Sequence, residues 1–156
     1  MGLGRALLAG SVGGLAGAAS MLPLFEGAKR AGILIETPPL RVVDEAAESA
    51  AEATEAGGPV EPGDRVAAAV GSHLLYGVAA GAFYGLLQDE LKLPGWLAGP
   101  VYGMLLWAAG YLGWMPAAGV MPQPWRQRTG DALTPVVAHV AYGVALGSVE
   151  GAIGRR

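Results

Sequence analysis

The chain contains no cysteine, and only two of its 156 residues are histidines. Without cysteine it can form no disulfide bond, thiolate nucleophile or cysteine-ligated metal site. Charged residues are also scarce, at 15%, whereas soluble domains contain about 25%. No phosphate-binding loop, HExxH zinc motif, nucleophile elbow or dinucleotide fingerprint occurs. We therefore expect neither an enzyme nor a metal site, and the net charge of −3 does not indicate a nucleic-acid partner.

Apolar residues, in contrast, make up 53% of the chain. They form four runs, at about residues 6–25, 66–87, 96–115 and 133–153. Crossing the roughly 30 Å hydrocarbon core of a bilayer takes about 20 such residues. We therefore predict an all-α integral membrane protein with four transmembrane helices, surrounded by the lipid bilayer.

The connection between the first two runs, residues 26–64, is long and acidic, and it carries nine of the thirteen acidic residues. Four of its glutamates recur at steps of three and four, which places them on one stripe of an Ala- and Glu-rich helix. These are Glu45, Glu48, Glu52 and Glu55. We predict an extramembrane loop with a short helix, whose acidic stripe is either a solvated face or a face that binds a cation or a partner.

A thirteen-residue phrase occurs twice in the chain. HLLYGVAAGAFYG, at residues 73–85, returns as HVAYGVALGSVEG, at residues 139–151, with seven of the thirteen positions identical. The first and third runs share a weaker match, LAGSVGG with LAGPVYG. The chain therefore resembles two tandem helical hairpins. Because each hairpin has two spans, both copies enter the membrane from the same side, which predicts a pseudo-twofold axis along the membrane normal.

Glycines recur at every fourth residue in the predicted spans. Residues four apart form one ridge along a helix, and a ridge of glycines in lipid is typical of a close helix–helix contact. We predict helix packing through Gly10, Gly14, Gly77, Gly81, Gly85, Gly95, Gly99, Gly103, Gly143, Gly147 and Gly151.

His73 and His139 head the two copies of the repeated phrase and form a candidate functional pair, since an ionisable residue within a span is often functional. Three interpretations are open. Each neutral imidazole can hydrogen-bond a neighbouring helix, Tyr76 or Tyr142, or interfacial water. The two rings can instead handle a proton or a ligand in a polar pocket. They can also be the two axial ligands of a haem, with the glycines leaving room for the macrocycle.

Glu150 is the other ionisable residue within a predicted span, and it replaces Tyr84 of the first copy. Because it lies near the end of the last span, its carboxylate can reach the membrane interface. A role as a carrier carboxylate is the alternative.

Four phrases carry a resemblance to a known family: GILIETPPLRVV, HLLYGVAAGAFYGLL, GPVYGMLLWAAGYLGWMPAAGVMPQP and AHVAYGVALG. Together they resemble small bacterial inner-membrane proteins similar to the YagU-like family. The resemblance covers most of the chain apart from the acidic segment 44–61. It implies a multi-pass protein of the bacterial inner membrane without assigned catalysis, and a shared loop motif that includes Glu36, Pro38, Pro39 and Arg41.

These observations lead to three functional hypotheses. The first is a structural or accessory subunit that packs through its glycine ridges against a membrane partner or as a homo-oligomer. The second is a pathway for a small solute or a proton that uses His73 and His139. The third is an electron carrier that binds haem through the same two histidines. In each case we expect both termini in the cytoplasm.

Overall fold

The computed structural model describes residues 2–54, 61–91 and 93–154, and every element in these ranges is a helix. The all-α prediction is thus confirmed for the described residues. The elements are α1 (Leu3–Arg30), α2 (Pro38–Thr54), α3 (Pro62–Leu91), α4 (Gly95–Ala108), the π-helix η1 (Ala109–Trp114), α5 (Met115–Ala117), the 3-10 helix η2 (Pro124–Arg126) and α6 (Thr129–Gly154).

Three helices, α1, α3 and α6, are long and apolar enough to cross a membrane. They coincide with the first, second and fourth predicted spans. The third predicted span, 96–115, is not one regular α-helix. Helix α4 ends at Ala108, and the chain continues as η1 and then as α5. Gly113 has non-helical dihedral angles, φ −108° and ψ −105°, and Pro116 has no N–H with which to continue the hydrogen-bond ladder.

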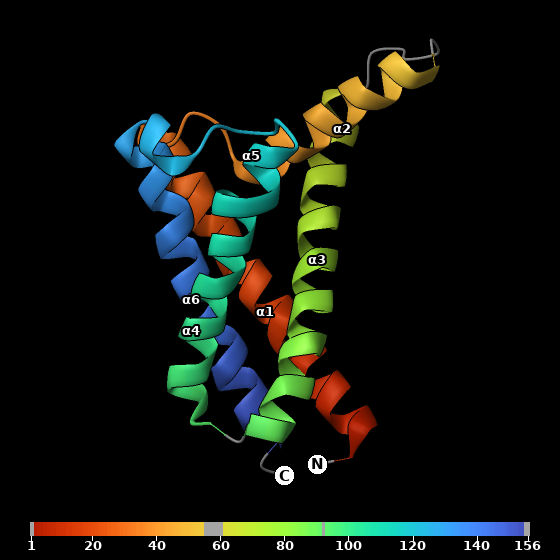
Figure 1. Ribbon diagram of the computed structural model, residues 1–156, viewed down its shortest axis with the longest axis vertical. Coiled ribbons are helices and arrows are strands. Elements are labelled where there is room, and N and C mark those ends of the chain that lie inside the picture. The colour runs from red at the N-terminus through yellow and green to blue at the C-terminus, as the bar shows by residue number, and fades with distance from the viewer. Residues whose placement is uncertain (1, 55–60, 92, 155–156) are drawn as a thin grey trace.

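Helix α1 is the centre of the bundle (Figure 1). It packs along α3 on one side and along α6 on the other, and α4 packs along α6. Figure 1 shows both chain ends at the end of the bundle where α3 finishes and α4 begins, and α2 and α5 at the opposite end. Successive helices α1, α3, α4 and α6 therefore run in alternating directions along the bundle.

The contact between α1 and α3 is built from glycines on both helices. A Cβ added to Gly14 would overlap the carbonyl oxygen of Gly77, and one added to Gly81 would overlap that of Gly10. At the end nearer the termini, a Cβ on Gly85 would overlap the carbonyl oxygen of Ala6. Only hydrogen fits at these positions, because the two backbones lie in direct contact.

The contact between α4 and α6 has the same construction. A Cβ added to Gly95 would lie 2.7 Å from the carbonyl oxygen of Gly147, and one added to Gly103 would overlap that of His139. A Cβ added to Gly99 would overlap the carbonyl oxygen of Gly143, and one added to Gly143 would overlap that of Gly99.

The two hairpins are offset by one helical turn from the match that the sequence suggests. The phrases LAGSVGG and LAGPVYG align Gly10 with Gly99. In the structure, however, Gly14 lies against Gly77 and Gly99 lies against Gly143, the repeat equivalent of Gly77. Gly14 and Gly99 therefore occupy equivalent positions in these contacts, although the sequence match aligns Gly10 with Gly99.

The contacts between the hairpins are not equivalent. Helix α1 packs along α6 at Gly13 and Gly17, and a Cβ on Gly17 would lie 2.7 Å from the Tyr142 ring. Counted from the equivalent pair Gly14 and Gly99, the position of Gly17 is taken in α4 by Tyr102. Its hydroxyl donates a hydrogen bond to the carbonyl of Ala80 in α3, at 2.7 Å. Because this large side chain stands between them, α3 and α4 meet only at isolated points.

Most of the motif predicted to lie in a loop is instead the start of α2, and Glu36 lies just before the helix. Pro38 and Pro39 open the helix, where their fixed φ and missing N–H cost nothing. Arg41 forms an ion pair with Glu36, at 3.4 Å. Further along α2, Asp44 accepts a hydrogen bond from Nε of Arg65 in α3, at 2.8 Å. The predicted loop helix is present, and of its acidic stripe Glu55 lies outside the described residues.

Candidate functional site

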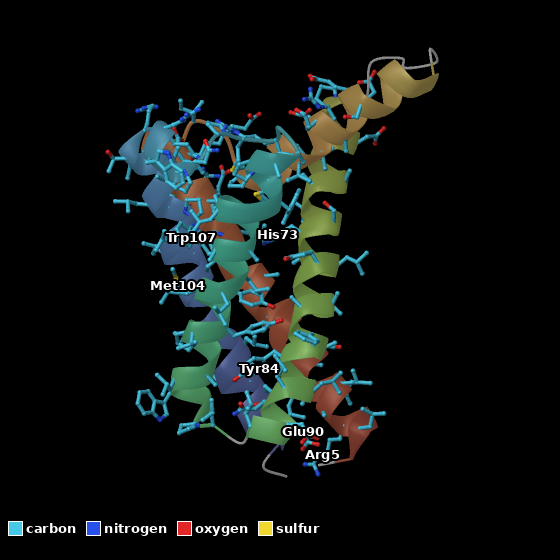
Figure 2. The ribbon with its side chains drawn as sticks, viewed as in Figure 1. Arg5, His73, Tyr84, Glu90, Met104 and Trp107 are labelled. Atoms are coloured by element: carbon cyan, nitrogen blue, oxygen red, sulfur yellow. The ribbon has the colours of Figure 1, made fainter. Side chains whose placement is uncertain are left out.

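A cavity of about 260 Å³ lies where α3 and α4 fail to pack together. Both histidines of the chain line it, His73 from α3 and His139 from α6, and we call it the histidine cavity. Figure 2 shows His73 on the side of α3 that faces α4. The structure thus brings together two residues that are 66 positions apart and belong to different hairpins.

Each imidazole is held by a backbone carbonyl. Nε2 of His73 lies 3.2 Å from the carbonyl oxygen of Ala18 in α1, and Nδ1 of His139 lies 2.8 Å from that of Pro135 in α6. A carbonyl oxygen can only accept, so in each pair the ring N–H is the donor. The prediction that the histidines bond a neighbouring helix is correct for His73, whereas His139 bonds within its own helix.

Aromatic rings support both histidines. Phe25 of α1 meets the ring of His73 edge-on, with the centroids 6.2 Å apart, and Tyr111 of η1 meets His139 edge-on at 5.8 Å. Edge-to-face contacts of this kind fix the plane of a ring without using its polar atoms. The orientation of each imidazole is therefore set by one carbonyl and one aromatic ring.

Tyr76 and Tyr142, the tyrosines predicted to support the histidines, both line the histidine cavity. Neither forms a hydrogen bond with a histidine among the described residues. The hydroxyl of Tyr142 donates instead to the carbonyl of Gly77, at 3.1 Å. Tyr76 is 53% exposed and stands at the rim of the cavity.

Sequence reasoning missed the contribution of the π-helical segment to this cavity. Tyr111 and Trp114 line it, and Trp107 stacks on Tyr111 with the centroids 6.1 Å apart. The three aromatics recur at steps of four and three, which is the spacing of one helix face. That signal was present in the sequence and indicated an aromatic wall on α4 and η1.

The first turn of α2 closes the end of the histidine cavity that lies away from the termini. Pro38, Pro39 and Val42 line the cavity there. The link before α2 is fixed to α6, because the N–H of Ile35 donates to the buried carboxylate of Asp131, at 2.9 Å. Pro38 and Pro39, which belong to the motif of the family resemblance, thus form part of the site.

A second cavity, of about 560 Å³, lies at the opposite end of the bundle, and Asp89 and Glu150 are among its lining residues. We call it the acidic cavity. Glu150 is only 5% exposed, so its carboxylate is buried among α6 and its neighbours. Gly151, predicted as a packing glycine, also lines this cavity.

Two tyrosines, which we call the tyrosine layer, lie between the cavities. Tyr84 of α3 and Tyr102 of α4 contact each other with ring centroids 5.2 Å apart, and both are buried. The Tyr84 hydroxyl has no hydrogen-bond partner among the described residues. Figure 2 places Tyr84 between His73 and the end of the bundle marked by Glu90 and Arg5. No described residue lines both cavities.

The haem hypothesis expects glycines that leave room beside the histidines. A Cβ on Gly77 would overlap the Cβ of Ala18, and one on Gly143 would overlap the carbonyl oxygen of Gly99. These two glycines therefore contact α1 and α4, although Gly77 also lines the histidine cavity, and haem binding stays a prediction. Among the described residues there is also no cluster of three or more side chains suited to hold a metal ion.

These features define the class of the protein: in its described residues it is an all-helical protein whose three longest helices suit a lipid bilayer, with a partly open cavity that several of the helices line. Comparison with protein-family models, curated proteins and solved structures finds no match for the chain. The resemblance to the YagU-like family stays a prediction.

Proposed function

We propose that the chain is a four-span protein of the bacterial inner membrane that binds a small lipophilic molecule in the histidine cavity. The observation that carries this proposal is the position of His73 and His139. They are the only histidines of the chain, they come from different hairpins, and they line the same cavity.

The fourth span in this proposal is the helical run formed by α4, η1 and α5. The three elements have 14, six and three residues. At about 1.5 Å per residue such a run is about 35 Å long, which is enough for the hydrocarbon core. It lies beside α6, which is itself long and apolar enough to span a membrane.

Size and lining both favour a small ligand. Ligand pockets measure about 300–1,000 Å³ and combine apolar and aromatic walls with a few polar groups. The histidine cavity, at about 260 Å³, lies just below that range, which favours a small ligand. Phe25, Tyr111 and Trp114 provide aromatic walls, and the two imidazoles are polar groups within them.

A purely structural or accessory role explains less of this geometry. Glycine contacts alone would hold the hairpins together, and packed interiors contain few voids larger than a water molecule. The opening kept by Tyr102 between α3 and α4 leaves such a void and lines it with both histidines. An accessory role stays the alternative if native purification yields a stoichiometric membrane partner.

A second candidate function is the passage of a small solute or a proton along the line between α3 and α4. The observation that favours it is the acidic cavity at the other end, separated from the histidine cavity by the tyrosine layer. In this case the solute or proton would enter at His73 and His139 and pass to Glu150. Flux through proteoliposomes that is lost in a His73→Ala, His139→Ala variant distinguishes passage from binding alone.

The experiment for the binding proposal uses two matched serines. Ser72 lines the histidine cavity and Ser148 lines the acidic cavity, and both are exposed. We expect Ser72→Trp to fill the first cavity and weaken binding of p-cresol, a small aromatic probe, at least tenfold. Ser148→Trp should leave binding unchanged. Equilibrium dialysis of the protein in nanodiscs measures both, and equal binding by the two variants would contradict the proposal.

A further inference from the structure

The two imidazoles of the histidine cavity present the same chemistry to a ligand. Each directs its N–H at a backbone carbonyl, Nε2 of His73 at Ala18 and Nδ1 of His139 at Pro135. A neutral imidazole has one donor nitrogen and one acceptor nitrogen. The remaining nitrogens, Nδ1 of His73 and Nε2 of His139, are therefore acceptors. No hydrogen bond joins either of them to another described residue.

Reversing these roles would leave a lone pair facing a carbonyl oxygen. Neither Ala18 nor Pro135 can supply a proton from its carbonyl, so the opposite tautomer would lose the hydrogen bond and place two acceptors against each other. The backbone of α1 and α6 thus determines which nitrogen of each ring stays available.

We infer that the natural ligand of the histidine cavity is a lipophilic aromatic alcohol, of the phenol or quinol class, that donates its hydroxyl hydrogen to Nε2 of His139 and, where it has a second hydroxyl, donates that one to Nδ1 of His73. This inference rests on the proposed binding function and adds the chemical class of the ligand. A molecule that carries only acceptors, such as an ether, a ketone or a quinone, would leave the imidazole nitrogens unpaired. Sites built to pair with a hydroxyl discriminate strongly against analogues that lack it.

The aromatic side chains that line the cavity indicate an aromatic ring in the ligand. Tyr111 and Phe25 already hold the imidazoles edge-on, and Trp114 and Tyr142 add further rings to the lining. Aromatic side chains favour an aromatic ring in offset or edge-to-face contact. A ring with one hydroxyl group fits the walls and pairs with one nitrogen, and a ring with two hydroxyl groups can pair with both.

The route into the cavity agrees with a lipophilic ligand. At the rim, Tyr76 of α3 and Trp114 of η1 are 53% and 43% exposed, and both belong to segments that we place in the membrane. The end away from the termini is covered by Pro38 and Pro39 of α2, whose link is held to α6 through Asp131. The open side therefore faces hydrocarbon, and a ligand that dissolves in the bilayer can reach the site.

The test compares p-cresol with 4-methylanisole, its methyl ether, which has a similar shape but no donor. Binding to the full chain in nanodiscs is measured by equilibrium dialysis, and partition into lipid is subtracted with the Ser72→Trp variant. We expect p-cresol to bind at least tenfold more tightly than the ether. Equal affinities would overturn the inference and leave the binding function intact, whereas the absence of cavity binding by either probe would overturn both.

A substitution locates the preference at a named atom. His139→Phe keeps a flat ring beside Tyr111 and removes the acceptor Nε2. We expect p-cresol affinity to fall towards that of the ether, while ether affinity stays within about twofold of that of the unsubstituted chain. Loss of binding for both probes to the same extent would contradict a donor–acceptor contact at His139. The comparison of the two probes on the unsubstituted chain does not depend on this variant.

Discussion

At the scale of the residue, the histidines show how backbone groups determine side-chain chemistry. His73 and His139 are equivalent in the repeat, yet they present different nitrogens, Nδ1 and Nε2, because their carbonyl partners lie in different places. The carbonyl of Ala18 reaches His73 from another helix, whereas that of Pro135 is one turn before His139 in the same helix. Two histidines at the same position of the repeat therefore take the same hydrogen-bonding role through different atoms.

Glycine contacts provide a prediction at the same scale. A Cβ at Gly14 would overlap the Gly77 backbone, whereas Gly71 of α3 has nothing within 4 Å of its added Cβ. Gly14→Ala should lower the free energy of unfolding by about 1–3 kcal/mol, the usual range for overpacking. Gly71→Ala should leave it unchanged or raise it by up to about 1 kcal/mol through helix propensity. Unfolding in mixed detergent micelles measures the difference, and similar losses in both variants would disprove a close contact at Gly14.

At the scale of the element, α2 is positioned by contacts at its start and along its length. The link before it is attached to α6, where Asp131 accepts from Ile35 and a Cβ on Gly130 would overlap the carbonyl oxygen of Ile33. Further along, Asp44 pairs with Arg65 of α3. The start of α2, which the sequence predicts as part of a loop, is thereby fixed across the histidine cavity.

The bond between Ile35 and Asp131 can be tested through a single amide. Asp131→Ala removes the acceptor, so hydrogen exchange at the Ile35 amide should accelerate at least tenfold. Asp131→Asn retains the acceptor oxygen and should preserve most of the protection. The Ala31 amide, which donates to Gly27 within the same region, is the internal reference. Unchanged exchange at Ile35 in the alanine variant, measured by NMR in micelles, would show that this bond does not hold the link.

The third predicted span shows why periodicity alone gives an incomplete element. Hydrophobic spacing indicates a helix through 96–115, but it does not distinguish an α-helix from a π-helix. Gly113 tolerates dihedral angles that other residues avoid, and Pro116 interrupts the ladder from the other side. The π-helix turns Tyr111 into the histidine cavity, and π-bulges of this kind are frequent at functional sites.

At the scale of the whole molecule, one pair of equivalent positions decides where the cavity lies. Gly17 in α1 permits close packing on α6, and Tyr102 in α4 prevents it on α3. The twofold relation that we predict for the hairpins is therefore broken in the contacts between them. A fully symmetric molecule would have either two tight contacts and no histidine cavity, or two open ones and a weaker bundle.

The number of spans can be tested because the chain has no cysteine of its own. Single substitutions Gly2→Cys, Ser49→Cys and Gly154→Cys place a thiol near each terminus and on α2. With four spans, a membrane-impermeant maleimide should label residues 2 and 154 from one side, the cytoplasmic side in our proposal, and residue 49 from the other. With three spans, residues 2 and 154 would be labelled from opposite sides, which would exclude Gly95–Ala117 as a span.

Much of the architecture follows from the sequence because it depends on local spacing. Apolar runs of about 20 residues identify α1, α3 and α6, and glycines at every fourth residue identify the ridges at which helices meet. The histidine pair is likewise visible, since the repeat places both rings at the head of the same phrase. Each of these features is determined within a few helical turns.

Only the tertiary structure decides the rest, because it depends on contacts between residues far apart in the chain. The one-turn offset between the hairpins, the opening held by Tyr102 and the burial of Glu150 all arise from the register of one helix against another. A ridge repeats every four residues, so its spacing cannot select that register. The same holds for the histidines: their sequence places them in helices, and carbonyls of the folded backbone determine which nitrogen remains to bind a ligand.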